Sequence, residues 1–296
     1  MFAAAVLVNF TWSVITILLV YLLGRYLFGE CVARVAVILL ICWPWSVWLG
    51  IAAQGDSMYQ CGFVALTYAM VRWQREGALR WLLLSAAICF LLTMTRYQGW
   101  IVAILVVSLL AATPLIRPVP RRYWRILVPL VALILLFPIS WLGYHAIVFG
   151  DPMHWKPNTE LGSWNRLNLS RVVRGGRFLA WVALTSPLFA PFMLLGIGKL
   201  RRLAKPEMVT YSLFSYGYFF ALIAYGAVSV NVARYLEQRY VVPTILVCLP
   251  LVAAVLVEIR IWWRARVVLI ACICIWSVVS CFRVTRQFQD EANIAE

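Results

Sequence analysis

The sequence has few charged residues. Asp, Glu, Lys and Arg make up 12% of its 296 residues, about half the share found in soluble domains, and 64% of the residues are hydrophobic. Such a composition excludes a soluble globular domain. It predicts a polytopic membrane protein whose main solvent is lipid.

Motifs of disulfide and metal sites are also lacking. The eight cysteines include no Cys-x-x-Cys pair, and no Asp-x-Asp pair occurs in the chain. Most cysteines lie inside apolar runs, where a thiol fills space as a small apolar group. We therefore expect no dedicated metal site and no cofactor, although the need for a divalent cation stays open.

Lysine is rare, with 3 residues against 23 arginines. The net charge of +15 could indicate nucleic-acid binding, but the basic residues lie mainly in short connections between apolar runs. They crowd every second connection, near 72–80, 117–125, 199–205 and 260–266. This alternation follows the positive-inside rule, so these connections are predicted to be cytoplasmic and both termini to lie outside. No nucleic-acid partner is expected.

Apolar runs dominate the rest of the sequence, and each approaches the length of about 20 residues that crosses a bilayer. Ten of them lie at 3–23, 31–49, 58–73, 79–95, 98–114, 125–147, 179–198, 210–229, 240–258 and 266–282. They do not alternate as the strands of an outer-membrane barrel do. The sequence therefore predicts an all-α fold, a bundle of about ten transmembrane helices forming one domain over 1–284, with a polar tail over 285–296.

The longest connection, 148–178, is predicted to lie on the outer face. Arg171, Arg174 and Arg177 follow one another at a spacing of three, with apolar residues between them. On a helix this spacing gives a basic stripe beside an apolar one. It predicts an interfacial helix against lipid headgroups.

Arg96 stands between the runs 79–95 and 98–114, where no room is left for a loop. It is therefore expected at the tip of a tight helical hairpin, at the outer surface of the membrane. An arginine held there beside Tyr97 and Gln98 can bind a phosphate at headgroup depth. The alternative is an interfacial anchor, in which arginine and tryptophan side chains reach the headgroup layer.

Two further outer segments carry candidate residues. Asp56 follows Gly55 at the expected start of a helix, where a carboxylate caps the N-terminus but can also face an outer cavity. Arg234, Arg239 and Tyr240 crowd a short outer connection, contrary to the usual charge bias, and an anionic ligand would account for them. An ion pair between Arg234 and a glutamate three residues later is the simpler alternative.

The order of several short motifs resembles that of the GT-C superfamily of integral membrane glycosyltransferases. In chain order they are Tyr21 to Gly29, Trp43-Pro44, Asp56-Ser57, Thr95-Arg96 with Gly99, Phe149 to Pro152, and Arg239-Tyr240 with Pro243. The branches most similar are the dolichyl-phosphate-mannose–protein mannosyltransferase-like and the aminoarabinose transferase-like ones. Each motif is short, and their order and spacing carry the resemblance.

The resemblance implies a transferase that moves a sugar from a polyprenyl-phosphate donor to a lipid, glycan or protein acceptor. Its active face would be periplasmic, in a bacterial inner membrane. Asp56 matches an acidic position of the family's cavity and is the candidate catalytic residue. The candidate substrate-binding residues are Arg96, Tyr97, Gln98, Arg234, Arg239 and Tyr240.

The sequence departs from the family at its start. The family normally begins with one more transmembrane helix and an outer loop that bears the acidic base, and this chain starts at what resembles the second helix. A truncated enzyme or a non-catalytic membrane subunit of the same family is therefore an alternative. A lipid or oligosaccharide transporter is another, but it predicts ionisable residues at the helix centres, where the runs have few.

Overall fold

A computed structural model of the chain shows helices throughout its described part. It describes residues 2–43, 56–116, 118–119, 122–152, 195–200, 205–222 and 242–258, with 267–268, 270–272, 275 and 279. Every element assigned within these residues is a helix, which confirms the all-α prediction there. The predicted interfacial helix and the tail over 285–296 lie outside them.

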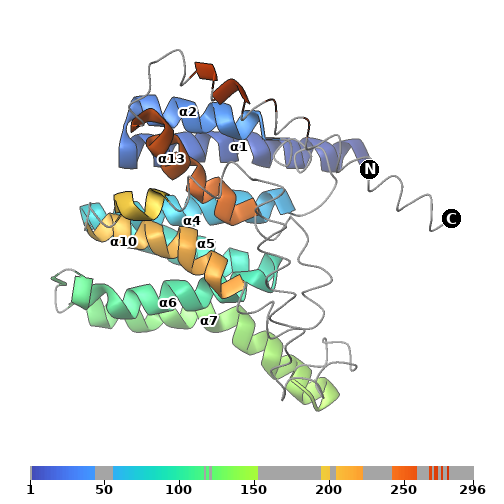
Figure 1. The fold of residues 1–296 in the computed structure, drawn as a ribbon. Helices are drawn as coiled ribbons and strands as arrows, with labels where there is room; N and C mark the ends of the chain where they lie inside the picture. Colours follow the sequence, from blue (N-terminus) through green and yellow to red (C-terminus); the bar gives the residue numbers. More distant parts are fainter. Residues whose placement is uncertain are drawn as a thin grey trace, which may run out of the picture. The chain divides into compact units, whose positions relative to one another are not determined.

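The chain forms two compact units, and the first comprises Met1–Cys61, Trp181–Arg202 and Ile245–Glu296. In it α1 (Phe2–Phe28) and α2 (Glu30–Ile41) lie side by side (Figure 1). Gly29 joins them with a φ of 96°, a conformation that glycine adopts at little cost. Most of α13 (Val242–Glu258) belongs to the same unit. The prediction of a single domain stays a prediction.

The Glu30 carboxylate links side chains on both sides of the turn between α1 and α2. The Tyr21 hydroxyl donates to both oxygens of Glu30, at 2.8 and 2.9 Å. The Nε atoms of Arg34 and Arg25 lie 3.0 and 3.3 Å from the same carboxylate. The hydrogen bond from Tyr21 and the two guanidinium groups hold the pKa of Glu30 below its usual value.

The second unit comprises Gly62–Ala180 and Leu203–Thr244. Its helices are most of α4 (Asp56–Glu76), then α5 (Leu79–Thr95), α6 (Gln98–Ile116), α7 (Arg122–Phe149) and α10 (Pro206–Ser212). Helix α5 packs against both α6 and α7 (Figure 1). A buried hydrogen bond of 3.2 Å from the Gln74 amide to the Thr113 hydroxyl links α4 to α6.

The helix that begins with α10 contains a π-helical turn, η2 (Leu213–Gly217), and continues to residue 222. Phe214 and Tyr218 contact Phe63 of α4, with ring centroids 6.0 and 4.6 Å apart. The extra residue of a π-turn shifts the face that a helix presents, and here both rings reach the same aromatic partner.

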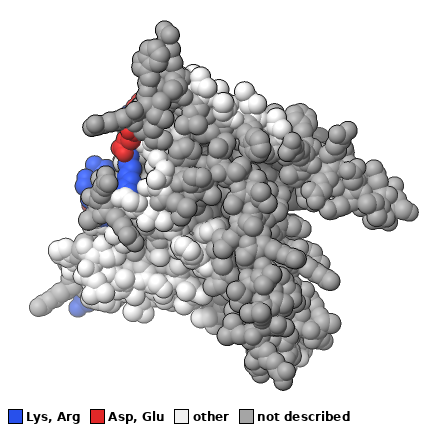
Figure 2. Space-filling view, viewed as in Figure 1, with Lys and Arg blue, Asp and Glu red and all other residues white. Residues whose placement is uncertain are grey.

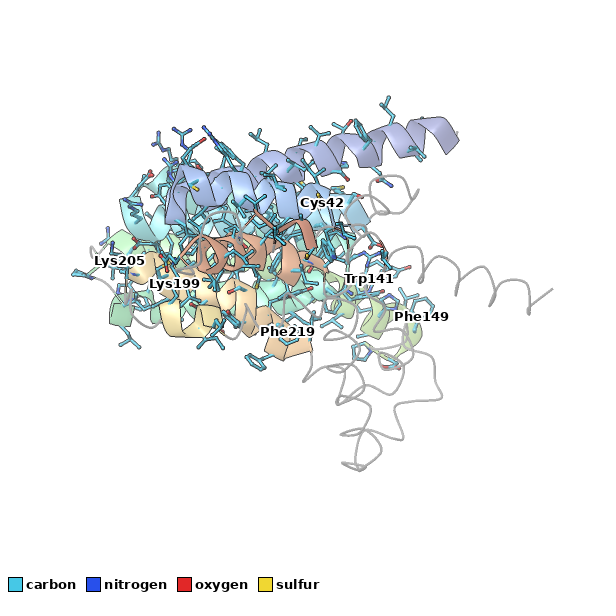
Figure 3. All side chains as sticks on the ribbon, turned by 45° about the horizontal axis from the view of Figure 1, so that its top comes forward. Cys42, Trp141, Phe149, Lys199, Lys205 and Phe219 are labelled. Carbon is cyan, nitrogen blue, oxygen red and sulfur yellow. The ribbon has the colours of Figure 1, made fainter. Side chains whose placement is uncertain are left out.

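Three described helical segments are long and apolar enough to cross a membrane: Ala4–Phe28, Gln98–Ile116 and Tyr123–Phe149. Leu79–Thr95 and Val242–Glu258 are apolar but shorter. Large apolar side chains stay exposed on these helices, among them Ile104 and Ile139 at 63% each. Figure 2 shows few charged side chains among the described atoms of its face. A lipid environment explains this surface, and the count of about ten spans stays a prediction.

Several helix ends differ from the sequence prediction. The run predicted over 98–114 stops at Pro114, but α6 continues through this proline to Ile116. Helix α7 likewise contains Pro129 and Pro138. The connection predicted near 72–80 is reduced to Gly77 and Ala78, because α4 extends to Glu76. Apolar runs therefore locate the helices but underestimate their polar ends.

Candidate active site

Asp56 is the first residue of α4, and its side chain is buried, at 2% exposure. Its neighbour Ser57 is 1% exposed. A carboxylate in the first turn lies in the positive field of the helix N-terminus, an interaction that stabilises the start of the helix. The structure thus places the predicted acid inside the first unit and not on an open surface.

Gln60 is a polar residue that the sequence interpretation passed over, because it lies inside the apolar run 58–73. Its side chain is 6% exposed, and its Nε2 has no hydrogen-bond partner within the described part of the chain. Buried amide donors are rarely left unpaired in proteins. The one signal in the sequence was an amide one helical turn after Asp56.

The predicted hairpin tip at Arg96 is confirmed as a two-residue connection, because α5 ends at Thr95 and α6 begins at Gln98. Arg96 has an extended backbone, with φ −155° and ψ 150°. Its N–H donates to the Leu92 carbonyl at 3.4 Å, and its own carbonyl accepts from the Gly99 N–H at 2.9 Å. The backbone of Arg96 is therefore held from both helices.

Gly99 makes this turn possible. A Cβ atom at this position would lie 2.1 Å from the Leu92 carbonyl oxygen and 2.8 Å from the Thr93 backbone nitrogen. Both contacts are with backbone atoms, which cannot rotate away. The turn therefore requires glycine at this position. The close contact between the two helices that glycine permits determines the position of Arg96 in the connection.

Aromatic groups surround the tip. The rings of Tyr97 and Trp100 meet edge to face at 5.3 Å, and the Trp100 indole donates to the Thr93 carbonyl at 3.2 Å. Tyr97 is 45% exposed, and partial burial raises its pKa. Such a pair also suits a membrane interface, so the anchor interpretation remains beside the phosphate-binding one.

The candidate residues belong to different parts of the chain. Asp56 belongs to the first unit, and Arg96, Tyr97 and Gln98 belong to the second. Three more candidates, Arg234, Arg239 and Tyr240, lie outside the described residues. Within the described ranges, no three His, Cys, Asp or Glu side chains gather as metal ligands would. The catalytic role of the acid and the substrate-binding role of the arginines stay predictions.

The N-terminal half of the chain is similar to a known family. Residues 2–141 match the model of the dolichyl-phosphate-mannose-protein mannosyltransferase family. The matched stretch contains α1 to α6, most of α7, and both Asp56 and Arg96. The match supports the relationship to GT-C-type glycosyltransferases. Together with the apolar helices it indicates an integral membrane protein. No match was found among the curated proteins or the solved structures.

Proposed function

We propose that the chain is a membrane glycosyltransferase that moves a sugar from a polyprenyl-phosphate donor to a lipid, glycan or protein acceptor at the non-cytoplasmic face. The observation that carries the proposal is the family match over α1 to most of α7. The description of that family names a lipid-phosphate mannose and a mannosyl transfer. The branch of the family, the donor, the acceptor and the bacterial inner membrane are parts of the proposal.

Chain connectivity supports placing Asp56 and Arg96 on the same side of the membrane. Asp56 is at the end of α4 that lies away from the Gly77–Ala78 connection. Arg96 follows the end of α5 that lies away from the same connection. If α4 and α5 each cross the membrane, as the runs 58–73 and 79–95 predict, the chain returns to the side from which it started, and both residues would serve the outer face.

The transfer needs a carboxylate to accept a proton and guanidinium groups to stabilise the leaving phosphate. The bond between the anomeric carbon and the phosphate oxygen breaks, and a bond to the acceptor oxygen or nitrogen forms. The Asp56 carboxylate would take the acceptor's proton, and the polyprenyl phosphate would leave with the electron pair of the broken bond. The Arg96 guanidinium would stabilise the charge that develops on this phosphate. Arg234, Arg239 and Tyr240 would contribute to the same phosphate site.

The test measures transfer of labelled mannose from a polyprenyl-phosphate donor into membrane material. Replacing Asp56 by Asn removes the base, and replacing Arg96 by Ala removes one phosphate contact. Each change is expected to lower the transfer rate at least about 100-fold. Arg34→Ala is the matched control, because Arg34 is an exposed arginine that pairs with Glu30. It should transfer as the wild type does.

Two results would contradict the proposal in different ways. Full transfer by correctly inserted Asp56→Asn and Arg96→Ala variants would show that the residue assignment is wrong. An inactive wild type, with a full set of membrane acceptors present, would favour a non-catalytic membrane subunit.

A further inference from the structure

The first turns of α4 form a buried polar group within the first unit. Asp56, Ser57 and Gln60 are 2%, 1% and 6% exposed. Helix α1 belongs to the same unit as these turns. A buried amide donor without a partner is unfavourable in an apolar interior, so the Gln60 amide beside this carboxylate indicates a place where a ligand binds.

Gln60 lies one helical turn after Asp56 in α4. The two residues are four apart, so they share one face of α4, and long helical side chains lean toward the helix N-terminus. The Nε2 atom of Gln60 is enclosed and lacks a hydrogen-bond partner among the residues that the structure describes. It is a donor whose burial becomes favourable when a ligand supplies an acceptor.

The chemistry of this pair selects its ligand. A carboxylate accepts hydrogen bonds and an amide N–H donates them, and residues 56–61 contain no Lys or Arg. A sugar hydroxyl can donate to the one and accept from the other, whereas a phosphate only accepts and is repelled by the carboxylate. We propose that Asp56 and Gln60 bind hydroxyl groups of a sugar ring, and not the donor's phosphate. This inference rests on the proposed function and identifies the sugar ring as the part of the substrate that these two residues bind.

The second buried glutamine of α4 offers a matched control. Gln74 is 2% exposed, and its amide donates to the Thr113 hydroxyl at 3.2 Å. Gln60→Met removes a donor that has no partner in the described structure. Gln74→Met removes one that has a partner. Methionine keeps nearly the same volume in both. Without ligand, Gln74→Met should therefore lower Tm, and Gln60→Met should leave it unchanged or raise it.

Binding of three probes to the purified full chain then tests the proposal: decaprenyl-phosphate mannose, decaprenyl phosphate and octyl mannoside. We expect Gln60→Met to weaken the binding of a mannose-bearing probe about tenfold, and to leave decaprenyl phosphate unchanged. An effect on the phosphate-linked mannose alone would indicate the donor's sugar, and an effect on octyl mannoside alone an acceptor sugar. Gln74→Met should bind all three as the wild type does.

The proposal is overturned if Gln60→Met binds both mannose-bearing probes with wild-type affinity, if it weakens decaprenyl phosphate to the same extent, or if the wild type binds no mannose-bearing probe. Transfer measured in parallel keeps the two claims apart. A wild type that binds mannose through Gln60 but transfers nothing would contradict the proposed function alone. If the wild type and Gln60→Met transfer mannose at the same rate and bind the mannose-bearing probes with the same affinity, this inference alone is contradicted.

Discussion

Replacing Gly99 by alanine should disrupt the turn that carries Arg96. The added Cβ would lie 2.1 Å from the Leu92 carbonyl oxygen, far inside van der Waals contact. That oxygen already accepts from the Arg96 N–H at 3.4 Å and from the Thr95 hydroxyl at 2.9 Å. Relief requires the start of α6 to move away from α5. We expect a loss of at least about 3 kcal/mol in the free energy of unfolding, the upper end for overpacked sites.

The measurement is thermal unfolding of the purified protein in detergent, in which about 3 kcal/mol corresponds to a Tm lower by roughly 6–12 °C. Gly143→Ala is the control, because among the described residues no atom beyond the local helix backbone lies within 4 Å of a Cβ at that position in α7. It should be neutral or stabilising, since alanine favours a helix over glycine by about 1 kcal/mol. Equal Tm values for the two variants would refute the packing described for this turn.

Two further predictions concern paired polar groups. Thr113→Val removes the acceptor of the buried Gln74 amide and should lower the free energy of unfolding by about 1–3 kcal/mol. Adding Gln74→Met should recover part of this loss, as measured by a double-mutant cycle. The pKa of Glu30 is below its usual 4.5, chiefly because Tyr21 donates to it, so its contribution is present above pH 4.5 and lost as the pH falls through the lowered value. Glu30→Gln should reduce this acid-side loss in Tm measured against pH.

Additive effects of the Gln74 and Thr113 changes would contradict their hydrogen bond. A Glu30→Gln variant whose stability falls toward acid pH as steeply as that of the wild type would show that other carboxylates dominate.

Hydropathy and the residues of the turn were sufficient to predict the α5–α6 hairpin from the sequence. The run 79–95 coincides with α5, and the placement of Arg96 at a tight connection is confirmed. Arg96 was identifiable because it separates two long apolar runs. The close approach of Gly99 to the Leu92 carbonyl could not be identified from the sequence, because it depends on the angle at which the two helices meet.

The sequence did not reveal which polar residues of α4 are buried and which of them have partners. Gln60 and Gln74 look alike in the sequence, and only the structure shows that Gln74 has a hydroxyl partner on α6. The predicted run 98–114 also stops two residues early, at Pro114, where the helix continues to Ile116. In a membrane-spanning helix the neighbouring helices and local side chains can satisfy a carbonyl that proline leaves without its donor.

The release of polyprenyl phosphate from its mannose conjugate tests the central claim most directly. Wild-type protein, reconstituted in vesicles with a membrane extract as acceptor, should release the lipid phosphate in step with mannose transfer. The Asp56→Asn, Arg96→Ala double variant should release it at least about 100-fold more slowly. Equal release by the wild type and the double variant would contradict the assignment of sugar transfer to these residues.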